Sequence, residues 1–182
     1  MSLDKAILGF LSYKPFTGYD LKKVFDSSVH HFWPADQSQI YRTMSRLEDQ
    51  GYLTSERIPQ EDRPPQKLYH LTKAGKEALY TWLKGPPPME KIRYPFLIQV
   101  FFAGLLEDDD ILAVFEKKAE GLRGLLESLQ VLEQEVREHT LEFPKKDRYF
   151  WLLTLEHGKW IERAELEWIE KVIGRLKNNE HK

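Results

Sequence analysis

Residues 36–51 read DQSQIYRTMSRLEDQG and carry a helix start signal at one end and a stop signal at the other. Asp36 can cap the helix, and Gln39, three residues later, can reach back to the Asp36 amide in a capping box. Gly51 suits the left-handed position that ends many helices. The apolar residues repeat at i, i+4 and i+7, as on one buried helix face: Ile40, Met44 and Leu47. The segment therefore predicts one amphipathic helix.

Residues 3–11 and 17–29 predict two helices before this one. The first is a short apolar stretch, and Thr17 with Asp20 can form a capping box at the start of the second. The apolar positions of the second helix follow a period of 3.6: Tyr19, Leu21, Val24, Phe25 and Val29.

After Gly51, the sequence predicts a hairpin and a fourth helix. Residues 52–58 and 67–71 suit strands, and the polar, proline-rich residues 59–65 suit an exposed hairpin tip. Thr72 can cap a helix that runs to about Leu83. The order helix, helix, helix, strand, strand, helix predicts a winged helix-turn-helix, within a chain that is mainly α.

The outward face of the helix in residues 36–51 is polar and basic. Stepping about 100° per residue from Ile40 places hydroxyl, amide and guanidinium groups away from the core. Such groups can bond base edges and phosphates in a major groove, and cations on the hairpin can follow the DNA backbone. The candidate DNA-binding residues are Ser38, Gln39, Tyr41, Arg42, Ser45, Arg46, Arg63 and Lys67.

Charge alone leaves another interpretation open. Residues 1–85 hold 12 Lys and Arg against 10 Asp and Glu, a net charge of +2, which is a weak electrostatic footprint for DNA binding. Winged helices also serve as protein-interaction modules. A protein-interaction module therefore stays an alternative to DNA binding.

Five motifs follow one another in the first 76 residues: AILGFL at 6–11, TGYDL at 17–21, SQIYR at 38–42, LEDQGYL at 47–53 and YHLTKAGK at 69–76. Together they resemble the PadR family of bacterial transcriptional regulators. The resemblance implies a dimeric winged-helix repressor whose third helix reads an operator. It would place base and phosphate contacts on Ser38, Gln39, Tyr41 and Arg42, with the wing around residues 63–67. The acidic Glu61 and Asp62 at the tip depart from a DNA-contacting wing.

Gly85-Pro86-Pro87-Pro88 is the strongest break in the chain, because prolines lack amide donors and fix φ. It predicts two domains, a DNA-binding domain at 1–85 and an all-helical domain at 86–182. Within this helical domain, the sequence predicts one helix from about Pro95, a second helix that begins at Asp108 to Asp110, and a third helix from about Asp147 to Lys177. The second is marked by Ile111, Phe115, Ala119, Leu122, Leu125, Leu129, Leu132 and Val136, and the third by Phe150, Leu153, His157, Trp160, Ile161, Ala164, Trp168, Val172 and Leu176.

The last helix predicts a homodimer. About 30 residues at 1.5 Å each make a helix of roughly 45 Å, too long for its apolar stripe to be covered within one chain. Two chains would also present two reading helices about 34 Å apart, matching a palindromic operator. The alternative is a monomer whose helical hairpin folds back on the winged domain. The longer PadR-like proteins have a helical dimerisation domain, so the resemblance extends loosely to this part.

Aromatic residues in the helical domain suggest a small-molecule effector site. The candidates are Phe102, Tyr149, Trp151, His157 and Trp160. Ordinary core or interface packing is the competing interpretation. Some PadR-like proteins release DNA on binding phenolic acids, which implies an aromatic acid as the effector. The residues alone do not separate a repressor from an activator.

The composition excludes several classes of protein. The 182 residues contain no cysteine, which rules out disulfide frameworks and cysteine zinc sites. There is no catalytic Ser/His/Asp grouping, phosphate loop or HExxH motif, so we expect no enzyme, cofactor or metal. The longest uncharged run, residues 94–106, is shorter than the roughly 18 residues of a membrane span. We expect a cytoplasmic protein.

Overall fold

The computed structural model describes residues 2–60, 63–87, 93–139 and 144–180. The chain divides into two compact units, residues 1–89 and 90–182. This division falls close to the proline-rich segment at which the sequence predicts a boundary after residue 85.

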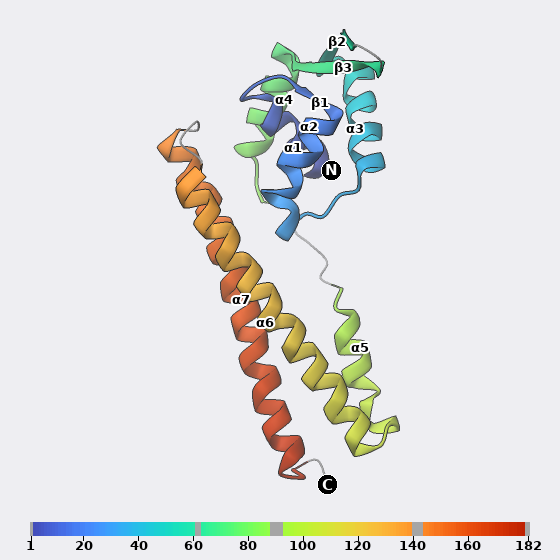
Figure 1. Ribbon diagram of the computed structural model, residues 1–182, viewed down its shortest axis with the longest axis vertical. Coiled ribbons are helices and arrows are strands. Elements are labelled where there is room, and N and C mark those ends of the chain that lie inside the picture. Colours follow the sequence, from blue (N-terminus) through green and yellow to red (C-terminus); the bar gives the residue numbers. More distant parts are fainter. Residues whose placement is uncertain (1, 61–62, 88–92, 140–143, 181–182) are drawn as a thin grey trace. The chain divides into compact units, whose positions relative to one another are not determined.

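The first unit is a winged helix-turn-helix (Figure 1), which confirms the predicted fold class. Three helices precede the hairpin and one follows it. The elements are α1 (Ser2–Leu11), β1 (Phe16–Thr17), α2 (Gly18–Asp26), the 3-10 helix η1 (Val29–His31), α3 (Gln37–Asp49), β2 (Leu53–Gln60), β3 (Arg63–Leu71) and α4 (Lys73–Leu83).

One apolar core joins the helices and the hairpin of this unit. Its fully buried side chains come from α1, α2, α3 and the start of β2: Ile7, Leu8, Leu21, Phe25, Ile40, Met44, Leu47 and Leu53. Tyr19, predicted on the buried face of α2, is instead half exposed, and Val29 lies in η1 beyond the end of α2. The predicted face of α3 is buried in full.

The hairpin is longer than the sequence predicts, and a third strand joins it. The sheet order is β1-β3-β2, with both pairs antiparallel. Pro59 lies in β2 where the pairing register shifts between Ile58 and Gln60, a place that tolerates a residue without an amide donor. Pro64 and Pro65 lie in β3 beyond its pairing with β1, where no described strand pairs with that edge of β3. The tip residues 61–62 are outside the described residues.

Two glycines shape this unit through their missing side chains. Gly51 has φ +75° and ends α3, as the sequence predicts. A Cβ on Gly75 would lie 2.3 Å from the carbonyl oxygen of Tyr52, so α4 packs directly on the backbone that follows α3.

The second unit is entirely helical within the described residues (Figure 1). Its elements are α5 (Pro95–Phe101), the 3-10 helix η2 (Ala103–Leu105), α6 (Asp108–His139) and α7 (Lys145–Lys177). Helices α6 and α7 are antiparallel, since Glu116 of α6 pairs with Lys177 at 2.8 Å and Glu133 pairs with Lys159. None of the described helices combines the length and apolar character that crossing a bilayer requires.

The face that α7 turns toward α6 matches the predicted one only near the end of the helix, where Val172 and Leu176 pack against the α6 cluster. The fully buried residues of α7 are Leu155 and Ile169. Ile169 packs in one cluster with the α6 residues Ile111, Phe115, Ala119 and Leu122. Much of the predicted stripe is exposed in the single chain, with Phe150 at 53% and Trp160 at 68%. Helix α7 therefore carries two apolar faces, of which α6 covers one. On α6, Leu125 is also exposed although the sequence predicts it in the seam.

Candidate nucleic-acid interface

The N-terminus of α3 is fixed by the predicted capping box. The Asp36 Oδ1 accepts hydrogen bonds from the Gln39 amide at 2.7 Å and from the Ser38 hydroxyl at 2.7 Å. The Gln39 Oε1 in turn accepts from the Asp36 amide at 3.0 Å. The hydrogen bond from Ser38, followed by that from Gln39, lowers the pKa of Asp36 below its usual value. Ser38 and Gln39 are exposed, but both take part in the cap.

Arg42 is the most available cation on α3. Its Nε donates to the Ser38 carbonyl and its Nη2 to the Ser38 hydroxyl, both at 3.3 Å, and the side chain is exposed. These are long bonds within one helix turn, which a base edge or phosphate can replace. Ser45, one turn further, is exposed as well. The two residues share the outward face, as the sequence predicts.

Tyr41 packs over the start of α2. A Cβ on Gly18 would lie 2.4 Å from the Tyr41 ring, so only glycine leaves room for the ring there. The ring is still 39% exposed. It forms the junction between α2 and the outward face of α3.

Arg46 and Lys67 are tied to carboxylates of the same unit. The Arg46 Nη2 lies 2.5 Å from the Asp4 Oδ1 of α1, and the Lys67 Nζ donates to the Glu48 Oε2 at 3.0 Å. Their charges are therefore partly neutralised within the protein by direct ion pairs. Arg63 begins β3, but its side chain lies outside the described part of the structure.

The wing also carries a cation that the sequence analysis did not select. Arg57 of β2 lies directly opposite Lys67 in the β-ladder and is exposed. Arg57 lies two residues after Ser55 in the strand predicted at 52–58. Because side chains alternate along a strand, Ser55 and Arg57 share one face, and this pattern could have identified Arg57 as a candidate cation of the wing.

The predicted effector residues do not meet in one chain. Phe102 lines an apolar hollow of about 310 Å³ formed by α5, η2 and the start of α6, together with Ile111 and Phe115. The other four candidates, Tyr149, Trp151, His157 and Trp160, lie in the first half of α7. Because the helices are antiparallel, that half of α7 lies at the opposite end of the hairpin from Phe102.

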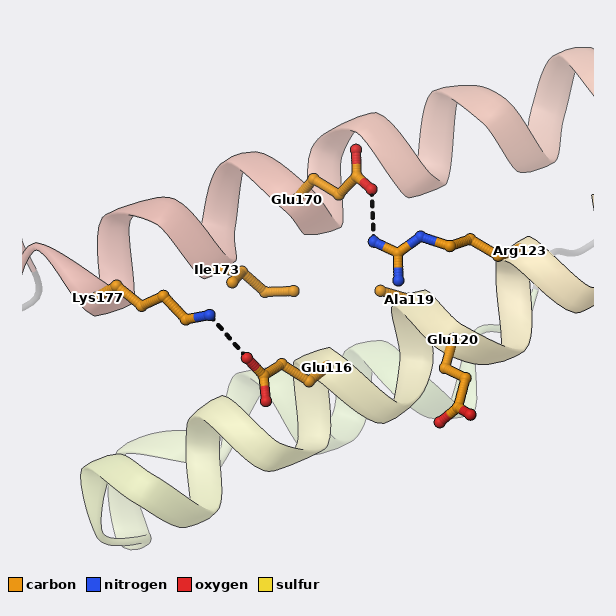
Figure 2. Close-up of a pocket in the computed structure, with 7 residues that line it drawn as sticks. All are labelled: Glu116, Ala119, Glu120, Arg123, Glu170, Ile173 and Lys177. Atoms are coloured by element: carbon orange, nitrogen blue, oxygen red, sulfur yellow. Dashed lines mark hydrogen bonds and ion pairs between the residues drawn. The ribbon is translucent and has the colours of Figure 1, made fainter.

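A second hollow, of about 500 Å³, lies between α6 and α7 (Figure 2). The Arg123 guanidinium lies 2.7 Å from the Glu170 carboxylate and the Lys177 ammonium lies 2.8 Å from the Glu116 carboxylate, one on each side of the hollow. With Glu120, the lining holds three carboxylates and two cations. Its net negative charge disfavours an anionic ligand. Within the described residues, no group of three or more His, Asp or Glu side chains is placed to hold a metal ion.

Comparison with known proteins covers both units. Residues 7–81 match the transcriptional regulator PadR-like family, and residues 92–177 match the family described as virulence activator alpha C-term. The negative transcriptional regulator PadR of Bacillus subtilis is 27% identical over 179 residues, which span 96% of this chain and 97% of that protein.

Solved structures match along nearly the whole chain. Bacillus subtilis PadR in complex with operator DNA has a TM-score of 0.81 at 26% identity, covering 97% of this chain and 99% of that one. The same protein in complex with p-coumaric acid has a TM-score of 0.75 at 26% identity, covering 96% and 95%. The Vibrio cholerae virulence activator AphA has a TM-score of 0.75 at 26% identity, covering 97% and 98%.

The winged helix-turn-helix with its long helical hairpin, together with the match to a family of transcriptional regulators, defines a DNA-binding transcriptional regulator rather than an enzyme. The chain belongs to the PadR-like family of transcriptional regulators, which confirms the resemblance found in its motifs.

Proposed function

We propose that the chain binds a palindromic operator as a homodimer, with α3 in the major groove and the wing along the backbone. The observation that carries this proposal is the outward face of α3, where Arg42 and Ser45 are exposed and the hydrogen bonds from Arg42 to Ser38 are long. Ser38, Gln39 and Tyr41 border the same face. Bidentate contact between an Arg and a guanine edge is the commonest specific contact in a major groove.

The uncovered face of α7 supports the homodimer. Four of its exposed apolar residues fall within about 100° of arc when the helix is stepped at about 100° per residue: Phe150, Leu153, Trp160 and Ile161. A contiguous exposed apolar patch on a regulator of this kind is typical of an interface. A second copy related by twofold symmetry would cover it and would present two α3 helices to one duplex.

The proposed regulator is a cytoplasmic repressor that leaves DNA when it binds a small aromatic acid. Support comes from the relative named as a negative regulator, whose solved complexes contain operator DNA and p-coumaric acid. The hollow beside Phe102 is at the lower end of the usual size range of ligand pockets, about 300–1,000 Å³. The four α7 candidates can join such a site only from a partner subunit, because they lie at the far end of the hairpin.

Activation is the second candidate function. The match of residues 92–177 to a virulence activator family, and the structural likeness to AphA, favour it specifically. The position of the operator relative to the promoter decides between the two.

The test is selection of bound fragments from the genomic DNA of the source organism, with and without hydroxycinnamic acids. We expect palindromic sites to be enriched and the acids to reduce their recovery. Failure to enrich any sequence would contradict operator binding, and enrichment that the acids leave unchanged would contradict the proposed effector.

A further inference from the structure

An ion pair at the base of the wing joins the recognition helix to both strands of the hairpin. Glu48, in the last turn of α3, accepts a hydrogen bond from the Ser55 hydroxyl of β2 on one oxygen. Its other oxygen accepts from the Lys67 ammonium of β3 at 3.0 Å. Glu48 therefore holds both strands of the wing against the end of α3.

The residues around this pair share one face of the hairpin. In the β-ladder Ser55 lies opposite Tyr69, and Arg57 lies opposite Lys67. Alternate residues of a strand point to the same face, so Arg57 and Lys67 form a cross-strand pair of like charges. Such a pair is destabilising unless an anion lies close by. Glu48 is the anion that this structure places there.

The electrostatics of the pair agree with its geometry. The hydrogen bond to Glu48 raises the pKa of Lys67, while the neighbouring Arg57 opposes that rise. The hydrogen bonds from Ser55 and then from Lys67 lower the pKa of Glu48. Within the free protein, the carboxylate thus occupies the position around Lys67 that a DNA phosphate would take.

We propose that Glu48 limits the sequence-independent part of DNA binding by holding Lys67 away from the phosphate backbone. This inference rests on the proposed DNA-binding role of α3 and the wing. A lysine that is already paired with a carboxylate releases no DNA counterion, so it adds nothing to the attraction that acts on all sequences alike. Among the described side chains on this face of the wing, Arg57 then remains the cation that can attract the DNA backbone.

The experiment measures how binding to a random-sequence duplex depends on salt, for the wild-type chain and two matched variants. Glu48→Gln keeps the shape of the side chain and can still accept from Ser55. Glu56→Gln removes the same charge from the opposite face of β2, where Glu56 pairs with His70 at 3.0 Å. The second variant therefore controls for the change in net charge.

We expect Glu48→Gln to bind the random duplex more tightly at low salt and to steepen the salt slope by about 0.9 for each wing on the duplex. Between about 50 and 200 mM salt, this slope adds about 3.5-fold to the loss of affinity for each wing. Glu56→Gln should keep the wild-type slope. The double variant Glu48→Gln with Lys67→Gln should return to the wild-type slope, because it no longer has a lysine to release.

Equal slopes for Glu48→Gln and Glu56→Gln would overturn the inference, and so would weaker binding by Glu48→Gln. Loss of cooperative thermal unfolding in Glu48→Gln would also overturn the inference, because Glu48 would then be a residue that the fold itself requires. Arg42→Ala separates this inference from the proposed function. If Arg42→Ala weakens operator binding while Glu48→Gln leaves the slope unchanged, only the role of Glu48 fails.

Discussion

Replacing Arg42 with alanine tests the reading role of α3. In the free protein, the exposed guanidinium makes two long bonds of 3.3 Å to Ser38 and attracts the exposed Asp36 carboxylate, so the substitution should change the stability of the fold little. On DNA, a side chain that bonds a base edge is worth about 1–3 kcal/mol. A dimer uses two copies at separate half-sites, whose contributions add, so the expected loss is about 2–6 kcal/mol.

The assay is a titration of a labelled operator duplex by fluorescence anisotropy, repeated with a duplex of random sequence. A loss of about 2 kcal/mol corresponds to roughly a thirtyfold increase in the operator Kd, and random DNA should lose much less. Lys73→Ala is the control, because Lys73 is an exposed cation of α4, 4.0 Å from Glu77. An operator Kd within twofold of wild type would refute the reasoning, as would an equal loss on both duplexes.

Three further predictions address the fold and the dimer. Gly75→Ala should lower the thermal unfolding midpoint by an amount equivalent to about 1–3 kcal/mol, because its Cβ would meet the Tyr52 carbonyl at 2.3 Å; an unchanged midpoint would contradict this packing. Trp160→Ala should weaken the dimer by about 2 kcal/mol or more, seen as a larger dissociation constant in sedimentation equilibrium, and no change would place the interface elsewhere. The hydrogen bond from Lys159 lowers the pKa of Glu133 in the folded protein. The ionised Glu133 carboxylate should therefore stabilise the fold fully above its unfolded pKa of about 4.3, and this stabilisation should be lost as the pH falls through its lower folded pKa. Unfolding curves of wild type and Glu133→Gln should therefore converge in acid, and a constant difference across that range would contradict the assignment.

Local signals predict α3 almost completely. Asp36, Gln39 and Gly51 act within one or two turns of the helix, and the buried face of Ile40, Met44 and Leu47 needs only a period of 3.6. The wing is less predictable, because its strands tolerate Pro59 only through a register shift that depends on the partner strand.

Side-chain partners far apart in the sequence decide much of the candidate site. Helical spacing alone places Arg46 near the outward face, whereas its guanidinium is held by Asp4, 42 residues away. The same holds for Lys67 and Glu48. On α7, the spacing of apolar residues fits two faces, and only the packing of α6 shows that Leu155 and Ile169 lie on the covered one.

The mass of the particle on operator DNA tests the central claim most directly. Sedimentation velocity of the free chain and of its complex with one operator duplex measures the number of chains in each. Two chains that share one palindromic site predict a free particle of twice 21.6 kDa and a complex of two chains per duplex. A free particle of 21.6 kDa at working concentrations, or one chain per duplex, would contradict the account.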